Sequence, residues 1–214
     1  MALAYQTALT IESVIKDIDS KKYLLPSIQR EFVWSTGQIE KLFDSLMRDY
    51  PINAFLFWKV PREKVSEFKF YEFLRDYHQK DNKHTPKANT NGTEDIIAIL
   101  DGQQRMTSLY IALKGTYAYK MSYKRWDNPA AYPKRKLYLN LLAASDDADM
   151  FYDFLFLTEE EAKNIKNDND EYEGSFWFPV GKILDFREES DVNDYLIDND
   201  LNTVADKAQA KFAN

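Results

Sequence analysis

The chain of 214 residues has no cysteine and only two histidines, His78 and His84. Without cysteine it cannot form disulfide scaffolds, cysteine-ligated zinc or iron–sulfur centres, or a thiolate nucleophile. Both histidines lie in the most polar stretch of the chain, which argues against a Ser-His-Asp site and a poly-histidine metal site. The chemistry of this protein must therefore use other side chains.

Long hydrophobic runs are missing as well. No apolar stretch approaches the ~20 residues of a membrane helix, and Met1–Gln6 has no signal-peptide pattern. Apolar residues nevertheless make up 44% of the chain and aromatic residues 15%, which suffices for a packed core and excludes a disordered chain. We therefore expect a cytoplasmic globular protein without membrane attachment.

Basic residues become scarce after residue 144. Residues 1–144 hold 22 basic and 16 acidic side chains, a balance of +6, whereas residues 145–200 hold 4 basic and 18 acidic, a balance of −14. This asymmetry indicates two surfaces with different partners or an acidic face for a basic partner, and a solvated acidic helical region explains it equally well. We expect two parts: residues 1–145, and an acidic, partly helical extension at 146–214.

Capping patterns and apolar periodicity predict the elements. Thr10 caps a first helix, and Ser35 and Thr158 open two others with capping boxes. A further, amphipathic helix follows the turn at residue 102 and ends at Gly115. Strands are expected at 54–60, 67–74, 96–100, 117–126 and 135–142, the first buried and the third central and buried on both faces.

Two segments lack such patterns. Arg75–Asp95 is almost free of large apolar residues, so we expect a long mobile loop or a hairpin with a disordered tip. The chain stops within Lys207–Asn214 without a strong helix terminator, which suggests a piece excised from a longer protein.

The most informative stretch is the run LDGQQR at residues 100–105, where polar residues follow a buried strand as a helix begins. The first N–H groups of a helix lack intrahelical partners and its dipole favours anions, so such turns often bind phosphate. Gly102 permits a close approach, Arg105 could pair with phosphate, and Asp101 could hold Mg²⁺ or orient water. Alternatively, Asp101 is an N-cap with Gln104 as its capping-box partner, which leaves a cation in the first turn unexplained.

A second polar cluster, Gln29-Arg30-Glu31, interrupts the apolar residues of the run PSIQREFVW at 26–34. It is either a functional cluster at a strand end or a surface Arg–Glu pair, which contributes little stability. Neither a Walker A motif nor G-x-G-x-x-G is present, so ordinary P-loop and Rossmann binding are excluded.

PSIQREFVW, followed by DYPINAFLFW at 49–58 and ILDGQQRMTSL at 99–109, resembles the N-terminal domain family of the GmrSD type IV restriction endonucleases. The resemblance covers residues 10–115 in this order and spacing. It implies an α/β (α+β) fold with a small mixed sheet and a ParB/sulfiredoxin-like core, followed by a more variable and more helical remainder.

The resemblance also implies a module that binds and hydrolyses a nucleoside triphosphate (NTP) with Mg²⁺ and controls restriction of phage DNA, modified DNA included. Its implied partners are DNA and a C-terminal or separate HNH-type nuclease domain, which two histidines in one loop cannot supply here. The oligomeric state stays open, a homodimer included. The site residues that it implies are Asp101, Gln104 and Arg105 for catalysis, Asp101 also for the metal, and Gln29, Arg30, Gly102 and Gln103 for nucleotide binding.

Residues 117–136 carry six basic side chains against one acid, with aromatic residues between them. Basic groups neutralise phosphates and aromatic rings stack on exposed bases, so this stretch predicts a nucleic-acid surface. A basic hairpin whose aromatic residues face the core explains it at least as well. The predicted DNA contacts are Lys124, Arg125, Lys134, Arg135 and Lys136.

Three functions remain open. The leading one is NTP hydrolysis in antiphage DNA restriction. The second is a ParB-like nuclease, which needs acidic metal ligands, and only Asp101 is well placed to be one. The third is a non-enzymatic module that binds DNA or a partner and uses nucleotide as a switch.

Overall fold

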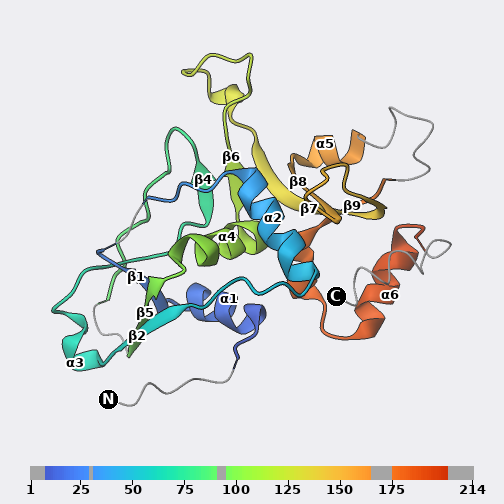
Figure 1. The fold of residues 1–214 in the computed structure, drawn as a ribbon. Coiled ribbons are helices and arrows are strands. Elements are labelled where there is room, and N and C mark those ends of the chain that lie inside the picture. The colour runs from blue at the N-terminus through green and yellow to red at the C-terminus, as the bar shows by residue number, and fades with distance from the viewer. Residues whose placement is uncertain (1–7, 29–30, 91–94, 165–174, 202–214) are drawn as a thin grey trace.

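The computed structural model describes residues 8–28, 31–90, 95–164 and 175–201, which form two β-sheets with helices packed against them (Figure 1). The α+β class expected from the sequence is confirmed. No helix within these ranges has both the length and the apolarity needed to cross a bilayer. The helices are α1 (Ile11–Asp19), α2 (Thr36–Met47), α3 (Arg62–Val65), α4 (Gln103–Lys114), α5 (Glu159–Asn164) and α6 (Glu189–Asp198), with the 3-10 turns η1 (Pro129–Ala131) and η3 (Val180–Asp185).

The first sheet has the strand order β2-β5-β1-β3, with β5 parallel to β1 and antiparallel to β2. The central position predicted for 96–100 is confirmed, since β5 lies between two strands. The expected burial of 54–60 is wrong, because β2 is an edge strand whose side chains are mostly exposed or half-buried. The strands are β1 (Tyr23–Pro26), β2 (Leu56–Val60), β3 (Phe70–Tyr71) and β5 (Ile96–Asp101).

The second sheet has the order β4-β6-β7-β8, and β9 also pairs with β7. Its first strand, β4, comes from the segment expected to be a long loop or a hairpin, and it pairs in parallel with β6. β8 and β9 both pair with β7, so the boundary drawn at residue 145 falls inside one sheet and the acidic residues complete it. The strands are β4 (Asp76–His78), β6 (Thr116–Ala118), β7 (Lys134–Ala144), β8 (Tyr152–Leu157) and β9 (Trp177–Pro179).

Helix α4 lies in the middle of the molecule (Figure 1). Every residue from Met106 to Leu113 is buried. The predicted amphipathic character is therefore wrong, because Thr107 and Ser108 are enclosed together with the apolar face. Burial on all sides holds the first turn of α4 in a defined place at the end of β5.

The predicted caps are confirmed. Ser35 and Gln38 form a capping box at the start of α2, and the Thr10 side chain caps α1. At α5, the Thr158 hydroxyl accepts the N–H of Glu161 at 3.1 Å, and the Glu161 carboxylate accepts the N–H of Thr158 at 2.7 Å. These bonds join residues three positions apart, so local sequence is sufficient to predict them.

Helix α2 covers the free edge of β8 with two carboxylates. Asp44 accepts the N–H groups of Phe151 and Tyr152, both at 2.8 Å, and Glu40 accepts the N–H of Phe156 at 3.0 Å. Edge N–H groups that are bonded in this way cannot pair with another chain. Burial of the Glu40 carboxyl raises its pKa to about 7.

Candidate functional site

Strand β5 ends at Asp101 and α4 begins at Gln103, so Gly102 alone forms the turn between them. Gly102 has a φ of +85°, and a Cβ at this position would lie 2.8 Å from Cε1 of Phe55. Both the left-handed backbone and the packing of Phe55 therefore require glycine. The Phe55 ring therefore fills the space beside Gly102 that a side chain would otherwise take.

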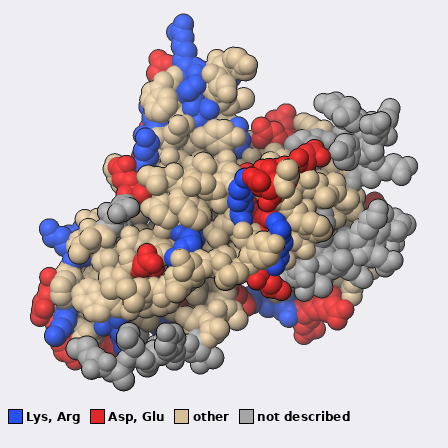
Figure 2. Space-filling model, viewed as in Figure 1, with Lys and Arg blue, Asp and Glu red and all other residues tan. Residues whose placement is uncertain are grey.

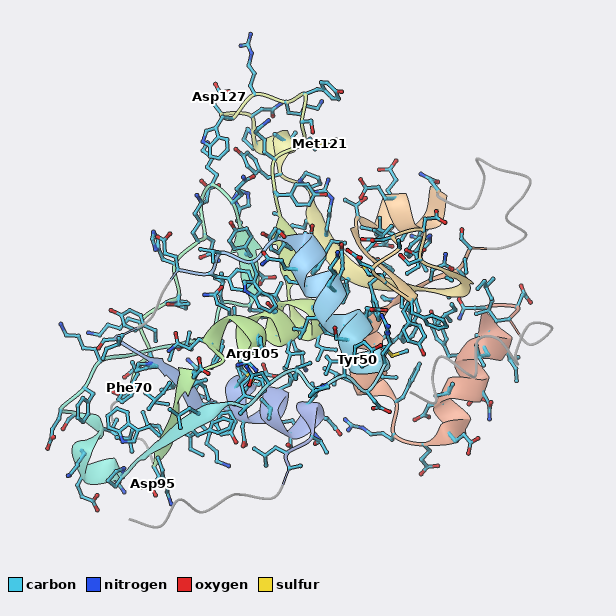
Figure 3. All side chains as sticks on the ribbon, in the orientation of Figure 1. Tyr50, Phe70, Asp95, Arg105, Met121 and Asp127 are labelled. Carbon is cyan, nitrogen blue, oxygen red and sulfur yellow. The ribbon has the colours of Figure 1, made fainter. Side chains whose placement is uncertain are left out.

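Arg105 reaches from the first turn of α4 to the loop before β2 (Figure 3). Its guanidinium donates to the carbonyl oxygens of Ile52 and Ala54, the latter at 2.9 Å, and lies 4.6 Å from the ring centroid of Phe55. Its side chain is only 15% exposed. These contacts explain a cation at a helix N-terminus without an anionic ligand, so the argument from the helix dipole does not hold here. Substituting Arg105 would perturb the fold as well as any ligand.

The two glutamines of the turn bind backbone groups. Gln104 Oε1 accepts the N–H of Val33 at 3.0 Å, and its Nε2 donates to the carbonyl oxygen of Glu31 at 2.9 Å. Gln103 Nε2 donates to the carbonyl oxygen of Ile99 at 2.9 Å, which holds the end of β5. The structure therefore brings the segment at 31–33 to the start of α4, although 71 residues separate Val33 from Gln104.

Gln29 and Arg30 lie outside the described residues. Their predicted position beside Gly102 therefore stays a prediction. It is supported by Glu31, the next residue along the chain, whose carbonyl oxygen binds Gln104.

Asp101 is the exposed carboxylate of the turn. Its side chain is 75% exposed, and Oδ2 lies 3.8 Å from Nη2 of Arg105. Asp101 does not cap α4, because the N-cap position is held by Gly102, which has no side chain to accept a hydrogen bond. The capping-box alternative for Asp101 and Gln104 is therefore wrong. The result is an uncapped helix N-terminus with a carboxylate next to it.

In the described part of the chain, no three His, Asp or Glu side chains gather closely enough to hold a metal ion. Mg²⁺ is commonly bound by one or two carboxylates together with the phosphate oxygens of its nucleotide. The exposed carboxylate of Asp101 fits that mode of binding.

The predicted DNA contacts differ in exposure. Arg135 is 4% exposed, lies 4.1 Å from the ring centroid of Tyr119 and is 3.6 Å from the carboxylate of Glu161. The alternation of side chains along β7 turns Arg135 inward, so the expectation that it contacts phosphate is wrong. Four predicted contacts are exposed: Lys124 and Arg125 before β7, and Lys134 and Lys136 on it.

Sequence reasoning missed the loop at 52–55 as a part of this site. Its signal is Asn53, which adopts a φ of +72° between the two carbonyl groups that bind Arg105. Asparagine tolerates this conformation better than most residues, so a lone asparagine before a strand indicates such a turn. Phe55, which we assigned to a buried strand, packs on Gly102 instead.

Fold and site together define an α+β domain in which chain segments far apart in sequence meet at one strand–helix turn. The chain matches the family model of the GmrSD restriction endonuclease N-terminal domain over residues 11–211, and it belongs to that family. The match includes the acidic part, for which the sequence motifs provided little support. By its description, the family is the N-terminal domain of a restriction endonuclease.

The chain is also similar to a longer protein. It is 31% identical over 115 residues to an uncharacterized protein of Methanocaldococcus jannaschii. The alignment covers 53% of this chain and 18% of that protein, so the chain spans less than a fifth of its relative's length.

Proposed function

We propose that this chain is the nucleotide-binding and nucleotide-hydrolysing module of an antiphage, modification-dependent DNA restriction system. The observation that carries the proposal is the convergence of 31–33, 52–55 and 101–105 at the uncapped N-terminus of α4. Such a helix end attracts phosphate through its free N–H groups and its dipole. Membership of a restriction endonuclease family supports the same function.

The backbone N–H groups of Gln103 and Gln104 donate to phosphate oxygens in this proposal. Asp101 orients the attacking water or binds Mg²⁺, and Arg105 adds positive charge that stabilises the developing negative charge. When bound with the nucleotide, Mg²⁺ would neutralise part of the phosphate charge.

Gln29 and Arg30 form the second wall of the same pocket in this proposal. They precede Glu31, whose main chain Gln104 anchors at the start of α4. A homodimer and an HNH-type nuclease, in the same polypeptide or a separate one, are the partners we propose for the module.

A non-enzymatic nucleotide switch is the second candidate. It is favoured by the side chains of Gln104 and Arg105, which hold two neighbouring segments in place. A nucleotide that displaces either contact would move the segment it holds, and no turnover is needed for that effect.

The test is nucleotide turnover by Asp101→Asn. The matched control is Glu63→Gln, which removes an exposed carboxylate on α3, at the opposite end of the β2–β5 pair. Phosphate release from each of the four common NTPs with Mg²⁺ is measured with and without DNA. We expect D101N to lose about 100-fold in turnover with an unchanged melting temperature, because the side chain is exposed.

Equal turnover by D101N and the parent chain would contradict the role of Asp101. Nucleotide binding without turnover by the parent chain, measured by calorimetry, would favour the switch. Absence of both binding and turnover would exclude the two candidates together.

A further inference from the structure

Between β6 and β7 the chain leaves the second sheet and forms a protrusion, which we call the finger (residues 119–133). Figure 1 shows the finger projecting from the top of the molecule, away from the helices. Figure 2 shows Lys and Arg atoms at its outer end. The finger carries Met121 and Asp127 on its outer part (Figure 3), and the site at α4 does not use it.

The finger is held in shape by its own contacts. Nζ of Lys120 donates to the carbonyl oxygens of Met121 at 3.0 Å and Lys124 at 3.1 Å. The Tyr132 hydroxyl donates to the carbonyl oxygen of Trp126 at 2.9 Å, and Tyr132 is buried at the base of the finger. A protrusion organised in this way presents its outer side chains in defined positions.

The outer side chains of the finger are aromatic and basic. Tyr123 is fully exposed and Trp126 is 50% exposed. Lys124 and Arg125 lie between them and are exposed as well. Asp127 is the one acidic residue in the finger's sequence. Because the Tyr123 ring is fully exposed, both of its faces are available to a ligand.

We propose that the finger binds DNA with exposed bases, with Tyr123 stacking on a base and with Lys124 and Arg125 contacting the flanking phosphates. Rings that alternate with cations suit such a ligand, because every base has a π-face and every linkage carries a charge. The core of a protein–protein interface is depleted in charged residues, whereas here Lys124 and Arg125 lie between the two rings in the sequence. The choice of DNA rests on the proposed restriction function.

The structure also limits how strongly DNA binding by the finger should depend on salt. The ammonium group of Lys120 is bonded to carbonyl oxygens of the finger itself, so we do not count it as a phosphate contact. Lys124 and Arg125 remain. Removing both should reduce the salt slope of log K by ~1.4, since each phosphate contact on a single strand contributes ~0.7.

The experiment measures fluorescence anisotropy with labelled oligothymidylate and a labelled blunt duplex over a range of salt concentrations. Three variants of the full chain are compared: Tyr123→Ala, Tyr123→Phe, and the double variant Lys124→Gln/Arg125→Gln. The matched control is Lys64→Gln/Lys69→Gln, which makes the same change in net charge with exposed lysines on and near α3.

We expect Y123A to bind oligothymidylate about 5- to 100-fold more weakly with an unchanged salt slope, and Y123F to restore binding. The salt slope of log K should be smaller for the double variant by ~1.4, since each of two phosphate contacts contributes ~0.7. The control should have the affinity and the salt slope of the parent. Equal affinity and slope for all variants, binding to the duplex alone, or no binding by the parent at low salt would each overturn the proposal.

Nucleotide turnover without DNA separates this proposal from the proposed function. Finger-dependent DNA binding by a chain that neither binds nor hydrolyses nucleotide would support the finger and refute the function. Nucleotide turnover by the parent chain, together with equal DNA affinity of the parent and the finger variants, would support the proposed function and refute the role of the finger. Unchanged melting temperatures in all variants would show that the fold is intact.

Discussion

At the scale of single residues, the polar side chains of the turn mostly bind the protein's own backbone. Gln104 and Arg105 satisfy backbone groups at 31–33 and 52–54, and Asp101 alone is largely exposed. Backbone groups outside helices and sheets also need partners, and long amide and guanidinium side chains can reach them. Any ligand at the start of α4 is therefore coupled to the positions of two other chain segments.

Glu40 leads to a prediction about pH. Burial, with a smaller contribution from the charge of Asp153, raises the pKa of Glu40 from 4.5 to about 7. The folded state thus binds this proton more tightly than the unfolded state, so stability should fall as pH rises from about 4.5 to about 7 and then level off. We expect Glu40→Gln to be more stable than the parent at pH 8, by about 1–3 kcal/mol, and nearly equal at pH 4.5.

Urea denaturation at a series of pH values measures this effect. The control is Glu63→Gln on α3, whose free energy of unfolding should depend on pH as that of the parent does. The amide oxygen that the E40Q substitution introduces can still accept the N–H of Phe156. If the free energy of unfolding of E40Q fell between pH 4.5 and 7 as steeply as that of the parent, Glu40 would not titrate in this range.

At the scale of elements, the connection from β5 to α4 determines the geometry of the site. One residue in a left-handed conformation reverses the chain, and the helix then enters the core buried on all sides. The first N–H groups of α4 are consequently held in place by packing and not by a capping side chain.

Gly102→Ala tests this connection, and Gly37→Ala in α2 is the matched control. An alanine at position 102 would be strained by the φ of +85°, and its methyl group would clash with the ring of Phe55. At Gly37 the nearest atom to an added methyl group lies at an ordinary 3.8 Å. We expect G102A to lower the free energy of unfolding by about 1–3 kcal/mol. G37A should raise it by up to ~1 kcal/mol. Equal effects of the two variants in urea denaturation would contradict the argument.

At the scale of the whole molecule, the basic and acidic parts of the chain share one core. Phe154, Phe178 and Leu196 from the acidic part belong to the same buried cluster as Ile15 and Leu109. Charge asymmetry along the sequence therefore marks different surfaces of one folded unit, as Figure 2 shows for the basic finger.

Truncation after residue 145 tests this unity. The shortened chain would lose β8 and β9 and expose Leu137, Leu139 and Leu141, which are buried in the full chain. We expect it to be unfolded or aggregated, since the edges of β7 that pair with β8 and β9 would be left open and its apolar face uncovered. Circular dichroism spectra and thermal melting curves of the truncated chain are compared with those of the full chain. A soluble product with a cooperative transition would show that residues 1–145 form an independent domain.

The sequence by itself determined the features that depend on neighbouring residues. The capping boxes at Ser35 and Thr158, the central strand at 96–100 and the helix that ends at Gly115 follow from patterns within a few positions, and the structure has all of them. The DGQQR run also marked the turn where distant segments of the chain meet, because polar residues there follow directly on a buried strand.

Only the tertiary structure decided which partners the polar residues take. Arg105 finds its acceptors 51 and 53 residues away, and Arg135 is buried because β7 lies inside a sheet. The exposure of β2 and the pairing of β4 likewise depend on which strands come to lie beside them. A side chain's hydrogen bonds and burial depend on what surrounds it in space, and local propensity contains no information about neighbours so far along the chain.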